Sequence, residues 1–145
     1  MSGHKFSERA RASVANRANR LCEYCMHPLD YSHTGFVLEH IIPIVKGGTH
    51  KLTNIALACD GCNSKKWIHT HAIDPLTNDL VELFNPRMDK WDEHFYWSEN
   101  LTSIHGSTPK GRATVGLLEM NRDSLVNFRK VLVATKKHPA QNKIT

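Results

Sequence analysis

The 145-residue chain has the size of one domain, and an apolar fraction of 40% with 8% aromatic residues predicts a thin core. No apolar run approaches the roughly 18 residues of a membrane span, and the first residues lack the apolar block of a secretory signal, so we expect a soluble, cytoplasmic protein without a membrane partner. The net charge is +4 for residues 1–71, −5 for residues 72–106 and +6 for residues 107–145, which together give the overall +5. This distribution suits a nucleic-acid surface made by the two basic ends, or it is ordinary solvated charge.

The first third of the chain predicts a helix followed by a strand, a loop, a second strand and a short helix. Ser7 is a suitable N-cap for the first helix, whose apolar positions recur every three or four residues and whose outer face is basic. Residues 36–42 favour a strand that Pro43 ends, and residues 54–59 favour a second strand. Residues 60–67 predict the short helix.

All four cysteines fall in two CxxC pairs, Cys22 with Cys25 and Cys59 with Cys62, separated by 33 residues. Two tight turns of this kind provide the four tetrahedral thiolates that a structural Zn²⁺ prefers. Disulfides are disfavoured by the expected cytosolic location, and a redox pair needs only one CxxC. We therefore predict a structural zinc, which with four thiolates lowers the net charge from +5 to about +3.

The segment after about residue 73 predicts loops with short extended pieces, then a hairpin that turns at Glu99 and Asn100. A helix capped by Thr108 follows, with Pro109 in its first position, and then a second helix capped by Asp123 or Ser124. The last helix is predicted to bury one set of side chains and to carry another on its outer face. The buried set is Leu125, Phe128, Leu132 and Val131, and the outer set is Arg129, Lys130, Lys136 and Lys137. The tail from residue 138 to 145 is expected to fray. Arg87, His94 and Arg112 either pack this segment or touch nucleic acid, and we favour packing.

Polar residues are crowded between residues 38 and 66. Glu39 and His40 are neighbours on a predicted strand, so their side chains point to opposite faces, and a loop from residue 43 to 52 folds back over one of them. Asn54 and Asn63 follow. The pattern resembles the HNH (ββα-metal) endonuclease family, in its four-cysteine zinc-containing branch. The resemblance covers about residues 20–67 and is carried by Cys22-x-x-Cys25, Glu39-His40-Ile41-x-Pro43, Gly47-Gly48, Asn54 and Cys59-x-x-Cys62-Asn63-x-x-Lys66.

The resemblance implies a role for each residue of the motif. His40 would be the general base that activates water, and Asn54 would pin the loop that orients it. Glu39 and Asn63 would hold one catalytic Mg²⁺ or Mn²⁺, and cleavage would leave 5′-phosphate and 3′-hydroxyl ends. The chain departs from the usual family pattern with Glu39 in place of Asp or His and Asn63 in place of His, so no imidazole binds the metal.

The same resemblance also suggests further metal-ligand positions and contacts to phosphate. Trp67 stands where some members of the family place a further His ligand; His69 and His71 are alternative ligands that we expect on the surface instead. Lys66 is expected to contact phosphate, while Lys65 either does the same or solvates the helix end. Other cations are candidates to follow the nucleic-acid backbone: Lys46, Lys51, Arg20, Arg9, Arg11 and Arg17.

These observations predict an α+β protein. Residues 1–71 are expected to form an N-terminal helix and a ββα-metal core with its four-cysteine structural zinc, and residues 72–145 a hairpin and helical extension packed on that core. The expected function is metal-dependent hydrolysis of DNA phosphodiester bonds, by nicking or double-strand cleavage, in a monomer or homodimer; RNA is not excluded as a partner. Two alternatives remain open: an inactive zinc-stabilised nucleic-acid-binding module, and an adaptor subunit.

Overall fold

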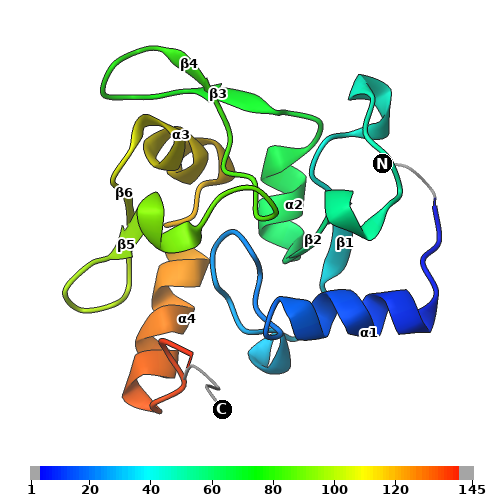
Figure 1. Cartoon of the computed structure of the whole chain (residues 1–145). Coiled ribbons are helices and arrows are strands. Elements are labelled where there is room, and N and C mark those ends of the chain that lie inside the picture. The colour runs from blue at the N-terminus through cyan, green and yellow to red at the C-terminus, as the bar shows by residue number, and fades with distance from the viewer. Residues whose placement is uncertain (1–3, 141–145) are drawn as a thin grey trace.

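The computed structural model describes residues 4–140, within which the chain forms four α-helices and three two-stranded antiparallel sheets (Figure 1). In chain order the elements are α1 (Glu8–Arg17), β1 (Val37–His40), β2 (Ile55–Ala58), α2 (Asp60–Lys66), β3 (His71–Ile73), β4 (Leu80–Glu82), β5 (Phe95–Trp97), β6 (Ile104–Gly106), α3 (Pro109–Leu118) and α4 (Asp123–Ala134). The predicted mixed α+β class is confirmed. None of these helices is long and apolar enough to cross a bilayer.

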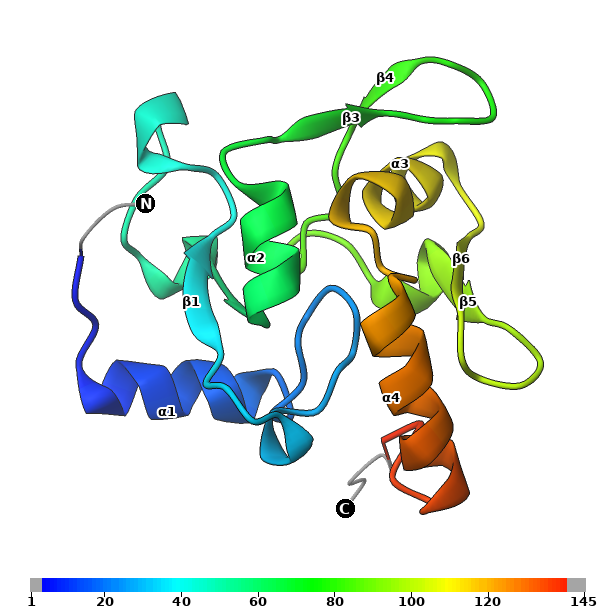
Figure 2. The same ribbon diagram turned by 180° about the vertical axis from the view of Figure 1, so that it is seen from behind.

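The predicted strand, loop, strand and helix are confirmed as β1, β2 and α2. The strands pair antiparallel with Val37 opposite Ala58 and His40 opposite Ile55. All four residues of β2 are buried, whereas β1 buries only Glu39, because β2 lies between the rest of the protein and its partner strand. Figure 2 shows α2 packed beside this hairpin and α1 running along its lower end.

Helix α1 begins as predicted, since the Ser7 hydroxyl accepts a hydrogen bond from the Ala10 amide. Its buried residues, Val14 and Ala15, pack in one apolar cluster with Ile55 and Leu57 of β2. At the other end of the helix the Arg17 guanidinium donates two hydrogen bonds. One goes to the carbonyl of Leu52, just before β2, at 2.9 Å, and the other to the carbonyl of Ile55, the first residue of β2, at 2.6 Å. The helix is thus fixed to the second strand by both packing and hydrogen bonds.

The segment after α2 forms two further hairpins and two helices. The hairpin predicted around Glu99 is confirmed as β5 and β6, and Thr108 caps α3 with Pro109 in its first turn, as expected. A continuous apolar cluster joins the extension to the cysteines of the core: Cys22, Cys25, Cys59, Cys62, Phe84, Phe95, Ile104, Leu118, Met120 and Leu125. The extension therefore buries its apolar surface against the four-cysteine region.

Polar contacts reinforce this packing and confirm that Arg87 and Arg112 are structural. Arg87 forms an ion pair with Glu23 and donates to the Ile55 carbonyl of β2, which ties the extension to the core. Arg112 of α3 donates from Nε and Nη2 to the two carboxylate oxygens of Asp74, both at 2.9 Å. This bidentate pair fixes α3 to the chain beside β3.

Four local predictions for the C-terminal region are wrong. Val131 of α4 is 56% exposed rather than buried with Leu125 and Leu132. Arg129 of α4 is almost fully buried rather than on the outer face, because its guanidinium donates to the carbonyls of Thr102 (2.9 Å) and Met120 (2.7 Å). The N-cap of α4 is Arg122, without a side-chain capping bond. His138, in the tail expected to fray, is buried and makes a 2.8 Å hydrogen bond to the Leu101 carbonyl; residues 141–145 lie outside the described part of the chain.

Candidate active site and metal centre

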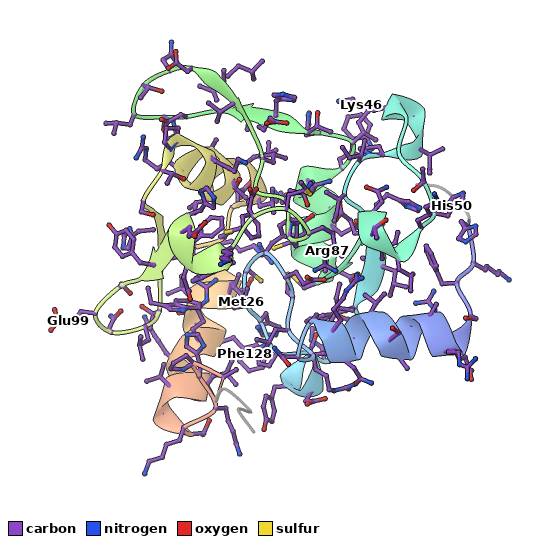
Figure 3. The ribbon with its side chains drawn as sticks, in the orientation of Figure 1. Met26, Lys46, His50, Arg87, Glu99 and Phe128 are labelled. Carbon is purple, nitrogen blue, oxygen red and sulfur yellow. The ribbon has the colours of Figure 1, made fainter. Side chains whose placement is uncertain are left out.

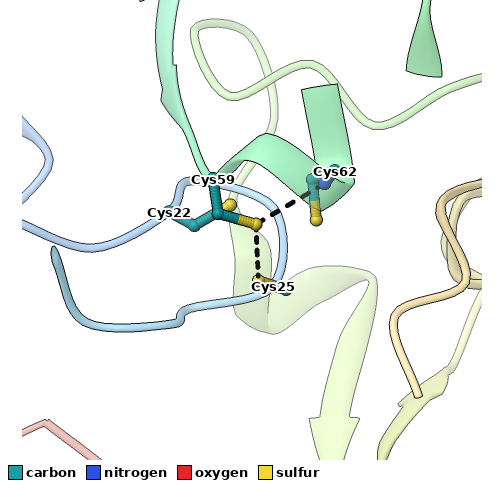
Figure 4. A group of neighbouring side chains, drawn as sticks. All are labelled: Cys22, Cys25, Cys59 and Cys62. Carbon is teal, nitrogen blue, oxygen red and sulfur yellow. Dashed lines mark hydrogen bonds between the residues drawn. The ribbon is translucent and has the colours of Figure 1, made fainter. Parts of the chain in front are cut away.

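The four cysteines are brought together by two short structures. Cys22 and Cys25 lie in the turn after α1, whose ends are joined by the Leu21 to Pro28 bridge. Cys59 is the N-cap of α2 and Cys62 lies in its first turn. All four side chains are buried, and their sulfur atoms lie within 4.8 Å of one another (Figure 4).

The spacing of the sulfur atoms fits a tetrahedral metal. A zinc ion with Zn–S bonds of about 2.3 Å requires sulfur to sulfur distances of about 3.8 Å, and the Sγ atoms of Cys25 and Cys59 are 3.7 Å apart. Four buried sulfur donors without carboxylates are the set that zinc prefers. The predicted four-cysteine metal centre is therefore confirmed at the level of ligand placement.

One cation from the extension lies against this centre. Arg122, at the start of α4, donates to Cys59 Sγ at 3.5 Å and to the Leu118 carbonyl at 3.2 Å. Gly61 makes room for it, because a Cβ atom at that position would collide with the Arg122 guanidinium. A positive charge here offsets part of the negative charge that four thiolates would bring to the metal.

The loop between β1 and β2 is fixed by Asn54. Its Oδ1 accepts from the Ile42 amide, and its Nδ2 donates to the carbonyls of Ile42 and Thr49, all at 2.9 Å. Gly48 lies where a Cβ would collide with the Ile42 carbonyl, so the close approach of the two loop segments requires glycine there. These contacts fold the loop back over the end of β1, as the sequence predicts.

His40 lies under this folded loop, with His50 as its partner. Nε2 of His40 and Nδ1 of His50 are 2.9 Å apart, and the ring of His50 stacks on that of His4 at a centroid distance of 3.8 Å. Partial burial lowers the pKa of His40, and the neighbouring His50, His4 and Lys66 lower it further by charge repulsion. His40 is therefore held in its neutral form at neutral pH.

Glu39 points to the opposite side of β1, into the protein. Its carboxylate and the Lys66 ammonium are 3% and 2% exposed, and Oε1 lies 2.5 Å from Nζ. The Tyr24 hydroxyl donates to Oε2 at 2.7 Å, and Lys66 also donates to the Ile41 carbonyl at 2.8 Å. Burial raises the pKa of Glu39, and the charge of Lys66 and the hydrogen bonds only partly offset it.

Glu39, His40 and Asn63 line one surface pocket of about 530 Å³. Asn63 reaches it from α2, and Trp67 from the residue that ends this helix. The rest of the wall is largely apolar and is supplied by the N-terminal segment, β1 and the loop that follows it. The pocket thus combines a partly exposed imidazole with Asn63 of α2, while the Glu39 carboxylate lies behind it, 3% exposed and paired with Lys66.

Comparison with known proteins identifies the part of the chain that contains this site. Residues 22–67 match the family model described as HNH endonuclease. These residues form an HNH domain. The domain includes both CxxC pairs and all four polar residues predicted from the motif.

A relative with a curated name is similar over a longer stretch than the HNH domain. The chain is 25% identical over 130 residues to the Septu protein PtuB from Bacillus thuringiensis, a match that covers 87% of this chain and 46% of the relative. The chain therefore spans about half the length of that protein. No solved structure matches the chain.

Five of the cations predicted to contact nucleic acid are arranged differently around the HNH domain. Lys46 and Lys51 are exposed on the loop between β1 and β2, and Figure 3 shows Lys46 on the same side of the molecule as His50. Lys65 pairs with Glu119 at 2.9 Å, and Arg20 pairs with Asp30 at 2.7 Å. Lys66 differs most from expectation, because the buried Glu39 carboxylate draws its ammonium into the protein.

Three residues of this site, His50, His4 and Tyr24, carry no signal in the sequence. His50 and His4 reach His40 through the loop and through the segment before α1, and no spacing rule predicts such contacts. Tyr24 lies between Cys22 and Cys25, where an aromatic residue gives no sign that it will bind Glu39. The exposed Trp67 stands out in the sequence only as a departure from the family pattern.

Proposed function

We propose that this chain is a metal-dependent endonuclease that hydrolyses phosphodiester bonds in DNA. The observation that carries the proposal is the pocket that brings a neutral, partly exposed His40 together with Glu39 and Asn63, on a strand, loop and helix held by the four-cysteine centre. The HNH domain at residues 22–67 and the similarity to the Septu protein PtuB support a role in the same family. Neither a binding module nor an adaptor needs this set of polar groups in one pocket.

His40 acts as the general base in this proposal. A neutral imidazole accepts a proton from water at cellular pH, and the lowered pKa of His40 keeps it neutral. His50 shares one hydrogen bond with it; the tautomer in which Nε2 of His40 donates leaves Nδ1 as the proton acceptor. Asn54 holds the loop that carries His50 and thereby keeps His50 beside His40 at the end of β1.

Glu39 and Asn63 are the residues that would hold a divalent metal. Their donor set fits Mg²⁺ or Mn²⁺, which prefer oxygen ligands. Because Oε1 of Glu39 lies 2.5 Å from the Lys66 ammonium, a metal held by this carboxylate would have to displace Lys66 from it. When bound, the metal would stabilise the negative charge that develops on the phosphate and on the leaving 3′ oxygen.

The exposed cations of the loop complete the proposal. Lys46 and Lys51 lie between the two strands of the HNH hairpin, beyond the residues that build the pocket. Contacts from such side chains to phosphates fix the position of nucleic acid without reading its sequence. We therefore expect little sequence preference from this chain alone.

Incubation of supercoiled plasmid with the purified chain tests the proposal. Nicked or linear DNA should form with Mg²⁺ or Mn²⁺ and should not form with Ca²⁺ or without a divalent ion. The ends should be 5′-phosphate and 3′-hydroxyl, which ligation of the nicks by DNA ligase verifies. Absence of cleavage by zinc-loaded protein that still binds DNA would instead indicate a binding module.

A further inference from the structure

A large aromatic side chain is exposed beside the proposed catalytic residues. Trp67 is 64% exposed and lines the same pocket as His40 and Asn63. The neighbouring wall is formed by apolar side chains that include Ile44 and Val45, of which Val45 is 78% exposed. A phosphate and sugar backbone has no use for such a wall, whereas the flat face of a base does.

The backbone at Trp67 is strained. Its φ of 47° and ψ of −123° fall in a region that L-residues other than glycine rarely adopt. The residue ends α2, and its amide bonds to the Asn63 carbonyl at 2.9 Å, a contact that glycine would make equally well. Strained residues of this kind persist mainly at functional sites.

Charges in the pocket favour a nucleotide over an apolar peptide. The negative charge of Glu39 is balanced by Lys66, and Arg11 lines the same pocket without an ion pair anywhere in residues 4–140. The pocket therefore offers a cation, a polar centre at His40 and an apolar wall. Its volume of about 530 Å³ lies within the usual range of about 300 to 1,000 Å³ for small-molecule sites.

We propose that this wall binds an unpaired nucleobase next to the scissile phosphate, stacked on Trp67. The proposal rests on the function proposed above and specifies its substrate class as single-stranded nucleic acid or an unpaired region within a duplex. Bases in a continuous duplex are stacked on each other and cannot reach a pocket wall unless they leave the helix. Phosphate contacts alone would bind duplex and single strand without this distinction.

Binding of fluorescein-labelled oligonucleotides without divalent metal tests the proposal. The probes are a 12-residue dT strand, an abasic strand of the same length and a 12-base-pair duplex, each followed by fluorescence anisotropy. Trp67→Ala should weaken binding of the dT strand roughly 5- to 150-fold, and Trp67→Phe should keep most of the affinity. The abasic strand and the duplex should bind equally well to all three proteins.

Two further variants exclude trivial explanations. Tyr96→Ala removes an aromatic side chain that is 54% exposed on β5, outside the pocket, and should bind every probe as the wild type does. Trp67→Gly relieves the backbone strain, so it should melt at a higher temperature and still lose dT binding. A loss in this more stable variant cannot result from unfolding.

The proposal is overturned if Trp67→Ala binds the dT strand like the wild type, if it loses affinity equally for all three probes, or if the wild type binds no single strand. The first outcome would point to an apolar peptide as the occupant of the wall. Plasmid cleavage by the wild type, scored in parallel, separates the two proposals. If the wild type cleaves plasmid but Trp67→Ala binds the dT strand as well as the wild type does, only the base site is rejected. If Trp67→Ala loses dT binding but the wild type does not cleave, only the nuclease function is rejected.

Discussion

The Lys66 ammonium lies 2.5 Å from Oε1 of Glu39, and both side chains are almost completely buried. Lys66 also donates to the Ile41 carbonyl, and Tyr24 donates to the other oxygen of the carboxylate. The pair thus joins α2 to the end of β1, directly behind His40. A buried charge is tolerated only when paired and hydrogen-bonded, so each partner depends on the other.

Lys66→Met should destabilise the protein by about 3 to 5 kcal/mol at pH 8, because it leaves the Glu39 carboxylate buried without a counter-charge. The cost should shrink as the pH falls. Burial already raises the pKa of Glu39, and loss of Lys66 raises it further. Between the unfolded pKa of about 4.3 and the raised folded pKa, only the unfolded state releases the proton, so stability falls as pH rises. Urea unfolding of variant and wild type between pH 5 and 8 measures the difference.

Two controls accompany this variant. Lys65→Met removes an exposed partner of Glu119 and should cost less than about 1 kcal/mol at every pH. Adding Glu39→Gln to Lys66→Met removes the unpaired charge and should abolish the pH dependence of the difference. A cost of Lys66→Met that is independent of pH would show that the Glu39 charge is not the cause.

Asn54→Ala should slow cleavage about 100-fold while DNA affinity stays unchanged. The side chain makes three hydrogen bonds that fold the loop over His40, and displacements of about 1 Å are sufficient for such losses. Asn100→Ala is the matched control, because the Asn100 side chain likewise takes part in three hydrogen bonds, all accepted by its Oδ1, in the turn between β5 and β6. Both variants should lose similar stability, but only Asn54→Ala should lose activity; equal activities would contradict the assigned role of Asn54.

Arg122→Ala should weaken retention of zinc by about 10- to 100-fold, as is usual when a partner of a metal ligand is removed. The guanidinium that contacts Cys59 is supplied by the extension, so this result would also show that the extension supports the metal centre. Zinc transfer to a chromogenic chelator gives the rate of release. Gly61→Ala should act in the same direction by displacing the guanidinium.

The control for zinc retention is Arg20→Ala. This variant removes a cation that pairs with Asp30 near the first CxxC pair but does not contact sulfur, and it should release zinc like the wild type. If Arg122→Ala also behaves like the wild type, the contact between Arg122 and Cys59 has no part in holding the metal.

Elements with local signals were predictable from the sequence. Ser7 and Thr108 cap the helices that they were expected to cap, because a capping hydrogen bond spans only three residues. The spacing of Cys59 and Cys62 fixes the start of α2 for the same reason. The β1 and β2 hairpin followed from a short apolar run on each side of two glycines.

Contacts between distant segments were not predictable. Arg129 carries no sign in the sequence that carbonyls of the β5–β6 turn and of the α3–α4 connection will surround it. In the sequence, His50 is one of several polar residues in a loop. Its contact with His40 depends on the hydrogen bonds of Asn54 that fold this loop. Lysine is rarely buried, so the sequence favours a surface position for Lys66, and only the position of Glu39 explains the exception.

The most direct test of the proposed nuclease activity is the rate of phosphodiester cleavage by His40→Ala compared with His105→Ala, at equal zinc content and equal affinity for DNA. His105 is exposed on β6, in the extension and outside the pocket. The rate should fall about 10² to 10⁴-fold for His40→Ala and should stay at the wild-type value for His105→Ala. Cleavage by His40→Ala at the wild-type rate would contradict the assignment of His40 as the base.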